Sequence, residues 1–135
     1  MEKLSEHTNV INWFEIPVTD SNRARKFYET ILDIKMNTQF MKEGNEEATF
    51  FPSVPGVIAA TSGRVSGVLV KNERAKPSRE GTLVYLNASP FIQAVIDRIE
   101  AAGGKILVPK TTARYGCYAV FIDTEGNRVG LHSEA

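Results

Sequence analysis

The two halves of this 135-residue chain carry the same order of secondary-structure signals. Each half begins with a β-rich segment, continues with apolar residues at helical spacing, and ends with three further strand-like segments. An internal repeat constrains a short chain strongly, because two copies of one unit should fold alike and bury their apolar faces together. We therefore expect an α+β fold of two βαβββ modules. The predicted strands are 9–17, 34–41, 47–51 and 67–71 in the first module and 82–87, 105–108, 117–122 and 128–132 in the second.

The predicted division of the chain follows from a polar segment near its middle. Residues 72–81 are mostly polar and include Pro77, which is typical of a linker. The first module is thus expected at about 9–72 and the second at about 82–135, within one domain of residues 1–135. Such a linker allows the modules to pair within one chain or to exchange between two chains, and the sequence favours neither.

Both predicted helices have a start signal and an apolar stripe. In the first module, Asp20 or Ser21 can accept hydrogen bonds from free backbone N–H groups and so begin the helix. In the second module, Ser89 supplies a capping hydroxyl before Pro90, a residue that suits the first helical position, and Gly103 is expected to end the helix. The expected stripes are Ala24, Phe27, Tyr28, Ile31 and Leu32 in the first helix and Phe91, Ile92, Val95, Ile96, Ile99 and Ala102 in the second.

Each predicted sheet has one face that its own helix cannot cover. A four-stranded sheet with a single helix buries one face well and leaves the other for packing or for a cavity. If the open faces of the two modules curve toward each other, the cupped mixed sheets enclose a cleft lined by strand residues. Clefts of this kind commonly bind small molecules, so a small organic ligand is the expected partner.

Composition excludes several other classes of partner. Sixteen basic side chains balance sixteen acidic ones, and no Lys/Arg block offers the positive surface that nucleic acid binding requires. Residues 1–9 are polar, and no apolar run approaches the roughly 20 residues that span a bilayer, so we expect no membrane partner and a cytoplasmic location. The single cysteine, Cys117, excludes an intramolecular disulfide, and we interpret it as a small core residue.

Four motifs together resemble one protein family. They are 13–20 (Trp-Phe-Glu-Ile-Pro-Val-Thr-Asp), the pair Phe27-Tyr28, 101–105 (Ala-Ala-Gly-Gly-Lys) and 123–132 (Asp-Thr-Glu-Gly-Asn-Arg-Val-Gly-Leu-His). On these motifs the chain resembles the vicinal oxygen chelate superfamily, which includes glyoxalase I, extradiol dioxygenases and bleomycin-resistance proteins. The resemblance covers nearly the entire chain. It implies paired βαβββ modules, a homodimer and, in the metal-dependent members, a divalent ion held by His and Glu side chains.

The metal site that the resemblance implies lacks its ligands in this sequence. Aligning the motifs places three of the family's ligand positions at Trp13, Leu83 and Gly130, none of which has a donor side chain. A chelating site needs several N or O donors in fixed geometry, and only one histidine, His132, falls in a predicted strand. We therefore predict no metal cofactor and no glyoxalase I activity. A divalent metal in a rearranged site around Glu15 and His132 is the alternative.

Two residues of the first predicted strand are expected to face the cleft. Trp13 and Glu15 lie two positions apart and therefore share a face. Trp13 is interpreted as filling the volume that a metal would occupy, or else as stacking on a planar ligand. Glu15 is either a paired or solvated carboxylate at the rim, or a general base or an anchor for a cationic or hydroxylated ligand.

Four residues of the second module are expected to face the same cleft. Tyr85 and Asn87 can offer a phenol and an amide to a ligand, unless they only fill the core. Arg128 can bind a carboxylate or a phosphate, and His132 can transfer protons near neutral pH. Both of these residues also fit a solvated surface position.

The sequence leaves three functions open. The leading hypothesis is a relative of the glyoxalase and bleomycin-resistance proteins that binds a small organic molecule in the cleft between modules without a metal. The first alternative is a metal-dependent lyase, isomerase or dioxygenase with a rearranged site. The second is a non-catalytic domain whose exposed sheets form a dimer. Whether the chain is an enzyme is left open, with Glu15 and His132 as the candidate catalytic residues.

Overall fold

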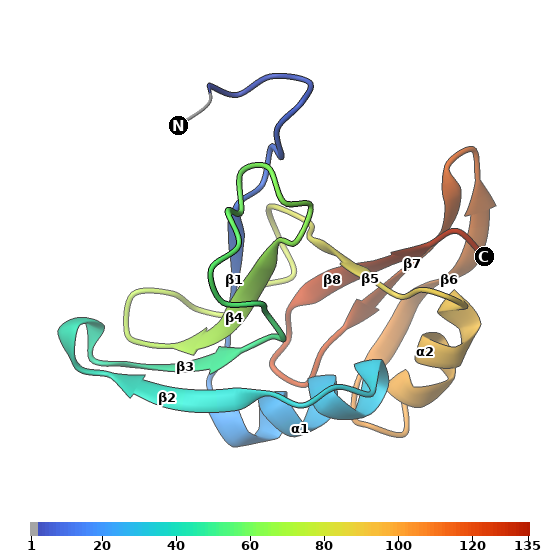
Figure 1. The fold of residues 1–135 in the computed structure, drawn as a ribbon. Helices are drawn as coiled ribbons and strands as arrows, with labels where there is room; N and C mark the ends of the chain where they lie inside the picture. The colour runs from blue at the N-terminus through green and yellow to red at the C-terminus, as the bar shows by residue number, and fades with distance from the viewer. Residues whose placement is uncertain (1–2) are drawn as a thin grey trace.

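The computed structural model describes residues 3–135 and has the predicted order of elements (Figure 1). The first module contains β1 (Trp13–Pro17), α1 (Ser21–Leu32), β2 (Asn37–Met41), a short 3-10 helix (Lys42–Gly44), β3 (Glu46–Phe50) and β4 (Ser66–Lys71). The second contains β5 (Tyr85–Asn87), α2 (Ile92–Ile99), β6 (Lys105–Ala113), β7 (Gly116–Ile122) and β8 (Arg128–Ser133). Each module is a βαβββ unit, so the predicted α+β fold class is confirmed.

The two sheets have the same strand order. The first is β1-β4-β3-β2 and the second is β5-β8-β7-β6. In each sheet the first strand of the module pairs in parallel with the last, and the other pairs are antiparallel. The helix carries the chain from one edge of the sheet to the other, which is why each sheet is mixed.

Both helices pack into one core that the modules share. The helices lie side by side in the lower part of Figure 1 and contact each other. The rings of Phe27 on α1 and Phe121 on β7 have centroids 5.9 Å apart, so an aromatic contact crosses the module boundary. The buried helix residues of this core are Ala24, Phe27, Tyr28 and Ile31 on α1 and Ile92, Val95, Ile96 and Ile99 on α2. The two sheets therefore bury their helix-covered faces together and keep the opposite faces open.

Asp20 begins α1, as predicted. Its side chain accepts a hydrogen bond from the backbone N–H of Arg23 at 3.0 Å, which satisfies a donor that the first helical turn leaves free. The helix ends at Asp33, whose left-handed backbone (φ 53°) turns the chain while its N–H donates to the Glu29 carbonyl. Among residues 3–135, neither α1 nor α2 has the length and apolar character that crossing a membrane requires.

The predicted start of the second helix is wrong. The helix begins at Ile92, and its N-cap residue is Phe91, which is 63% exposed and offers no capping side chain. Ser89 does not cap the helix, because it lies two residues before the N-cap position, in a turn where its backbone N–H donates to the side-chain oxygen of Asn87 at 2.9 Å. Pro90 consequently lies before the helix rather than at its first position.

Several strands differ in length from the prediction. The first strand does not begin at Asn9, because the backbone and side-chain N–H groups of Asn9 donate to the carbonyls of Ala60 and Ala59 in a loop. The strands β2 and β5 also begin later than predicted. In contrast, β6 continues to Ala113, since it pairs with β7 along a hairpin that closes between Ala113 and Gly116.

A buried hydrogen-bond network joins the two modules. The carboxylate of Asp123 accepts from the Tyr28 hydroxyl at 2.7 Å and from the backbone N–H groups of Glu125 and Asn127 at 2.9 Å each. The side-chain amide of Asn127 donates to Asp123 at 3.0 Å and to the carbonyl of Pro17 at 2.7 Å. Burial, together with the charge of Asp123, raises the pKa of Tyr28 well above its ordinary value, so the phenol stays protonated and keeps donating.

Glu125 extends this network to the β1–α1 turn. Its carboxylate accepts from the backbone N–H groups of Thr19 and Asp20 at 2.9 Å each and from Arg23 Nε at 2.7 Å. Although burial raises the pKa of Glu125, these hydrogen bonds, that of Arg23 foremost, lower it to about 2. We name the whole set the module latch, and its members are Pro17, Thr19, Asp20, Arg23, Tyr28, Asp123, Thr124, Glu125 and Asn127.

Candidate functional site

The six candidate ligand-binding residues fall into two groups in the structure. Three line a cavity of about 500 Å³ between the modules, which we name the module cleft: Trp13, Glu15 and Arg128. The other three line a cavity of about 500 Å³ on the open face of the second sheet, which we name the sheet pocket: Tyr85, Asn87 and His132. The two cavities share no lining residue. The prediction of one cleft lined by all six residues therefore needs correction, because the second sheet has a hollow of its own.

The module cleft is built from three parts of the chain. β1, an edge strand of the first sheet, contributes residues of both its faces, the start of β8 contributes Arg128, and the segment between the modules contributes Lys76, Ser78 and Glu80. Arg128 Nη2 donates to the carbonyl of Gly81 at 2.9 Å. Its Nε is buried and has no hydrogen-bond partner among residues 3–135. Leaving a buried N–H unpaired costs roughly 1–3 kcal/mol, and this atom has too little accessible surface for a ligand to reach it. Arg128 makes no ion pair in the described part of the chain, so the charge of its guanidinium is available to an anion.

The charged residues of the module cleft are balanced in sign. Two acidic residues, Glu15 and Glu80, and two basic ones, Lys76 and Arg128, line the same cavity. Glu15 is exposed, and it takes part in no ion pair in the described part of the chain. The paired carboxylate weighed from the sequence is thus not what the structure contains. Glu15 is a solvated carboxylate that remains able to accept a hydrogen bond from a hydroxyl or an amine.

Trp13 is partly buried against the first sheet and partly exposed to solvent. Its ring packs against Phe50 with centroids 6.3 Å apart and a tilt of 54°, while the residue is 47% exposed. Behind it, Val68 and Val70 are buried on the same face of the first sheet. Trp13 therefore fills part of the open face and still presents aromatic surface to the module cleft.

The ligand positions expected for a metal do not fit a metal ion. Trp13 offers only a ring, and Leu83 lies before β5 and has no donor atom. At Gly130, a Cβ would lie 2.5 Å from the ring of Tyr85, so the aromatic ring takes the space into which a ligand side chain would project. Within residues 3–135, no three His, Cys, Asp or Glu side chains gather closely enough to hold a metal ion. Glu15 and His132, the pair in the alternative metal site, line different cavities.

The sheet pocket contains one residue that the sequence interpretation missed. Tyr118 on β7 lies opposite His132 on β8, and His132 lies opposite Asn87 on β5, so the three side chains form a row across the open face. Tyr118 lines the pocket with them. The signal was present in the sequence, because pairing the strands 117–122 and 128–132 across their turn places Tyr118 beside His132.

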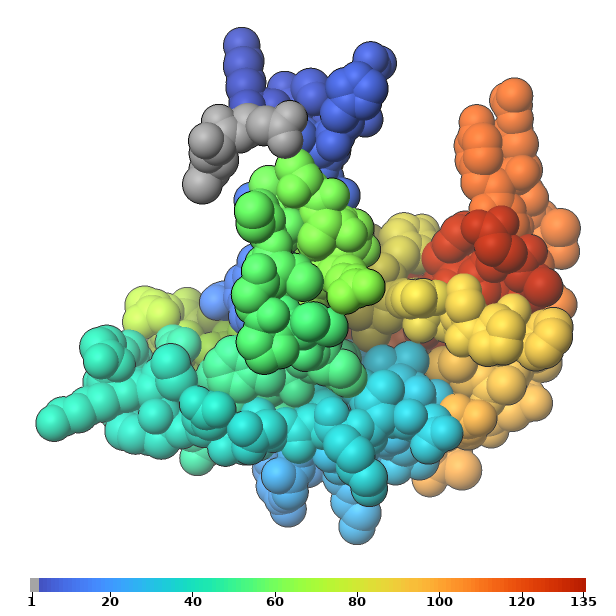
Figure 2. Space-filling model, in the orientation of Figure 1, coloured from blue at the N-terminus to red at the C-terminus, as the bar shows by residue number. Residues whose placement is uncertain are grey.

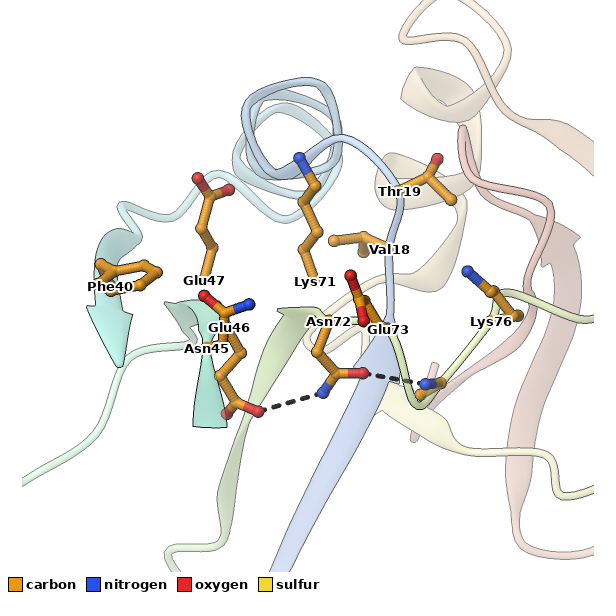
Figure 3. Close-up of a pocket in the computed structure, with 11 residues that line it drawn as sticks. Val18, Thr19, Phe40, Asn45, Glu46, Glu47, Lys71, Asn72, Glu73 and Lys76 are labelled. Carbon is orange, nitrogen blue, oxygen red and sulfur yellow. Dashed lines mark hydrogen bonds between the residues drawn. The ribbon is translucent and has the colours of Figure 1, made fainter. Parts of the chain in front are cut away.

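A third cavity of about 430 Å³ lies between the β1–α1 turn, the ends of β3 and β4, and the segment after β4 (Figure 3). In Figure 3, Glu47 and Lys71 rise from neighbouring strands toward α1. The Asn72 amide donates to Glu46 at 3.1 Å and accepts from the Ala75 backbone N–H at 2.9 Å. Glu46 and Asn72 are thus engaged with each other at its edge. No motif in the sequence pointed to this cavity.

Comparisons with known proteins agree with this architecture. Residues 10–131 match the model of the Glyoxalase/Bleomycin resistance protein/Dioxygenase superfamily. A glyoxalase I variant from Zea mays has a TM-score of 0.67 at 18% identity, over 90% of this chain and 46% of that one, so this chain spans about half of the maize chain. A glyoxylase/bleomycin resistance protein/dioxygenase domain from Frankia sp. EAN1pec has a TM-score of 0.66 at 16% identity, over 93% of this chain and 97% of that one. The fosfomycin resistance protein FosX from Listeria monocytogenes has a TM-score of 0.61 at 16% identity, over 94% of this chain and 91% of that one. No curated protein matches the chain.

Proposed function

The chain belongs to the Glyoxalase/Bleomycin resistance protein/Dioxygenase superfamily, and on that premise we propose that it binds a small organic acid in the module cleft without a metal ion. The observation that carries this proposal is the guanidinium of Arg128, a residue that lines the cleft and makes no ion pair in the part of the chain that the structure describes. A carboxylate of the ligand would accept from this guanidinium in a charge-assisted hydrogen bond.

The negative charge of Glu15 in the cleft further restricts the chemistry of the ligand. Glu15 is free to accept from a hydroxyl or an amine, and Trp13 and Pro17 offer apolar surface to the body of the molecule. An organic acid with an aromatic ring and a hydroxyl or amino group satisfies all three parts of the cleft. Mandelate, an aromatic hydroxy acid, has these groups and is a suitable probe.

Metal independence is supported by the residues at the family's ligand positions. An indole at Trp13, an aliphatic chain at Leu83 and a glycine at Gly130 supply no donor that a divalent ion prefers. We therefore propose that charge and shape in the cleft select the ligand. Neither an oxidation nor an isomerisation is part of this proposal, because nothing in the cleft identifies a reacting group.

The proposal is tested by titrating protein dialysed against EDTA with mandelate and following NMR chemical shifts. Saturable shifts at the Trp13 indole are expected, with mandelamide, which lacks the carboxylate, binding at least tenfold more weakly. Arg128→Gln should abolish most of the difference between the two probes. Arg79→Gln is the matched control, since Arg79 is exposed and does not line the cleft. Equal binding of both probes, or binding that needs added metal, would contradict the proposal.

We also propose that the chain forms a homodimer through the protruding edge of its first module. Val10, Ile11 and Ile58 are 82%, 56% and 66% exposed, and the hydrogen bonds from Asn9 hold their two segments together. Figure 2 shows the N-terminal segment and the loop after β3 standing out together above the body. Light scattering of the original chain should give the mass of a dimer, and Ile58→Asp should shift the mass toward that of the monomer. A monomer mass for the original chain would contradict the proposed dimer.

A further inference from the structure

The sheet pocket differs in chemistry from the module cleft. Its lining consists of Tyr85, Leu86, Asn87, Tyr118 and His132, with no Asp, Glu, Lys or Arg. A charged ligand would lose hydration there without meeting a side chain of fixed opposite charge. The lining therefore favours a neutral molecule.

The strand register gives the pocket its shape. Asn87, His132 and Tyr118 face one another across β5, β8 and β7, and neighbouring strands lie about 4.8 Å apart, so the row spans roughly 10 Å. The ring of Tyr85 stands over Gly130 and forms a wall beside this row. A flat molecule of one or two fused rings fits along the row with one face or edge against the phenol rings.

The hydrogen bonds already made determine which polar atoms remain available. The side-chain oxygen of Asn87 accepts from the Ser89 backbone N–H at 2.9 Å, which leaves the two N–H groups of its amide as donors. His132 Nε2 lies 2.8 Å from the carbonyl of Tyr115. A carbonyl can only accept, so Nε2 carries the proton, and in the neutral ring Nδ1 is the acceptor. One row thus combines an amide donor with an imidazole acceptor on directly paired residues.

From this arrangement we propose that the sheet pocket is a second binding site, for a neutral planar molecule that carries a carbonyl beside an N–H or O–H group. The ligand carbonyl accepts from the Asn87 amide, its N–H or O–H donates to Nδ1 of His132, and its rings lie against Tyr85 and Tyr118. This site is independent of the module cleft, because the two cavities share no lining residue and favour ligands of different charge.

The experiment uses isocarbostyril, a neutral bicyclic lactam with an N–H next to its carbonyl, and its N-methyl derivative, which lacks the N–H. Titration of the full chain, followed by NMR chemical shifts, should show saturable binding of isocarbostyril at Tyr85 and Tyr118. The N-methyl compound should bind at least tenfold more weakly. Mandelate should leave these two resonances unchanged, which separates this site from the module cleft.

Two variants test the donor and the independence of the site. Asn87→Asp keeps the oxygen that accepts from Ser89 but replaces the amide donor by a second oxygen, so isocarbostyril should bind at least tenfold more weakly while the protein stays folded. Arg128→Gln should leave isocarbostyril binding unchanged even where it removes mandelate binding. The proposal is overturned by equal binding of the two lactams, by full affinity in Asn87→Asp, or by an absence of saturable binding.

Discussion

The module latch and the module cleft both lie where the two modules meet, but they differ in whether their polar side chains have partners within the protein. In the latch, the Glu125 carboxylate accepts six hydrogen bonds, from the β1–α1 turn, from Arg23 on α1 and from Thr124 beside it. In the cleft, neither Arg128 nor Glu15 makes an ion pair within residues 3–135. The difference separates the two roles: the satisfied groups hold the modules together, and the unsatisfied groups are available to a ligand.

The largest loss of stability is expected when the carboxylate at the centre of the latch is removed. Asp123→Ala deletes the acceptor for Tyr28 and for two backbone N–H groups in a buried network, so the free energy of unfolding should fall by about 4 kcal/mol. Chemical denaturation measures this loss. Asp97→Ala, at an exposed position on α2, should change it by less than about 0.5 kcal/mol. A loss below about 1 kcal/mol in Asp123→Ala would show that the latch does not hold the modules.

Acid should weaken the latch through Glu125. Its pKa is lowered from 4.5 to about 2 in the folded protein, so the folded state is stabilised above pH 4.5 and loses that stabilisation as the pH falls from 4.5 toward 2. With allowance for solvent screening, the contribution is about 2 kcal/mol. Urea unfolding at a series of pH values measures it. Glu125→Gln should flatten the curve over this window, and a curve that keeps its slope in the variant would assign the acid effect to other groups.

Removing one hydrogen bond from the latch should have a smaller effect. Tyr28→Phe keeps the ring in the core but leaves Asp123 with one acceptor site unpaired, so the free energy of unfolding should fall by about 1.5 kcal/mol. Tyr115→Phe is the matched control, because Tyr115 is 74% exposed and should change the stability very little. Equal stabilities of the two variants would contradict the role given to the Tyr28 hydroxyl.

The smallest change in stability is expected for a substitution in the cleft, which contrasts the cleft with the latch. Arg128→Gln removes one hydrogen bond to Gly81 and also removes a buried N–H that had no partner, so the two changes nearly cancel. The free energy of unfolding should shift by less than about 0.5 kcal/mol. Denaturation of this variant beside Asp123→Ala provides the measurement. A large loss in Arg128→Gln would give the cleft residue a structural role instead.

The elements with local signals are the ones that the sequence predicts well. Asp20 caps α1 and the stripe through Phe27 and Ile31 is buried, because both features depend on residues within one or two helical turns. The start of α2 is predicted wrongly for a related reason. Ser89 has the right side chain for a cap, but it lies in a turn with Asn87, two residues before it, and the helix begins only after Phe91. A pattern of residue types does not show whether a polar residue belongs to the helix or to the turn before it.

The site is predicted less completely than the fold. The alternation along strands places Glu15, Tyr85 and His132 on open faces, but it does not reveal that the open faces form two separate cavities. That division depends on how the two modules pack through their helices. The latch is missed as well: the sequence suggests only a turn at residues 123–127, whereas Glu125 is bound to Arg23 from the other module.

The latch also affects the order in which the chain can reach its final structure. Its hydrogen bonds between the two modules join residues 95 to 110 positions apart, from the Tyr28–Asp123 bond to the one between Asn127 and Pro17. During synthesis the first sheet and α1 are made well before the turn that holds them. Until that turn emerges, the Tyr28 hydroxyl lacks its acceptor, and such long-range closure slows folding. The first module is therefore completed by residues that are translated after β5, α2, β6 and β7 of the second.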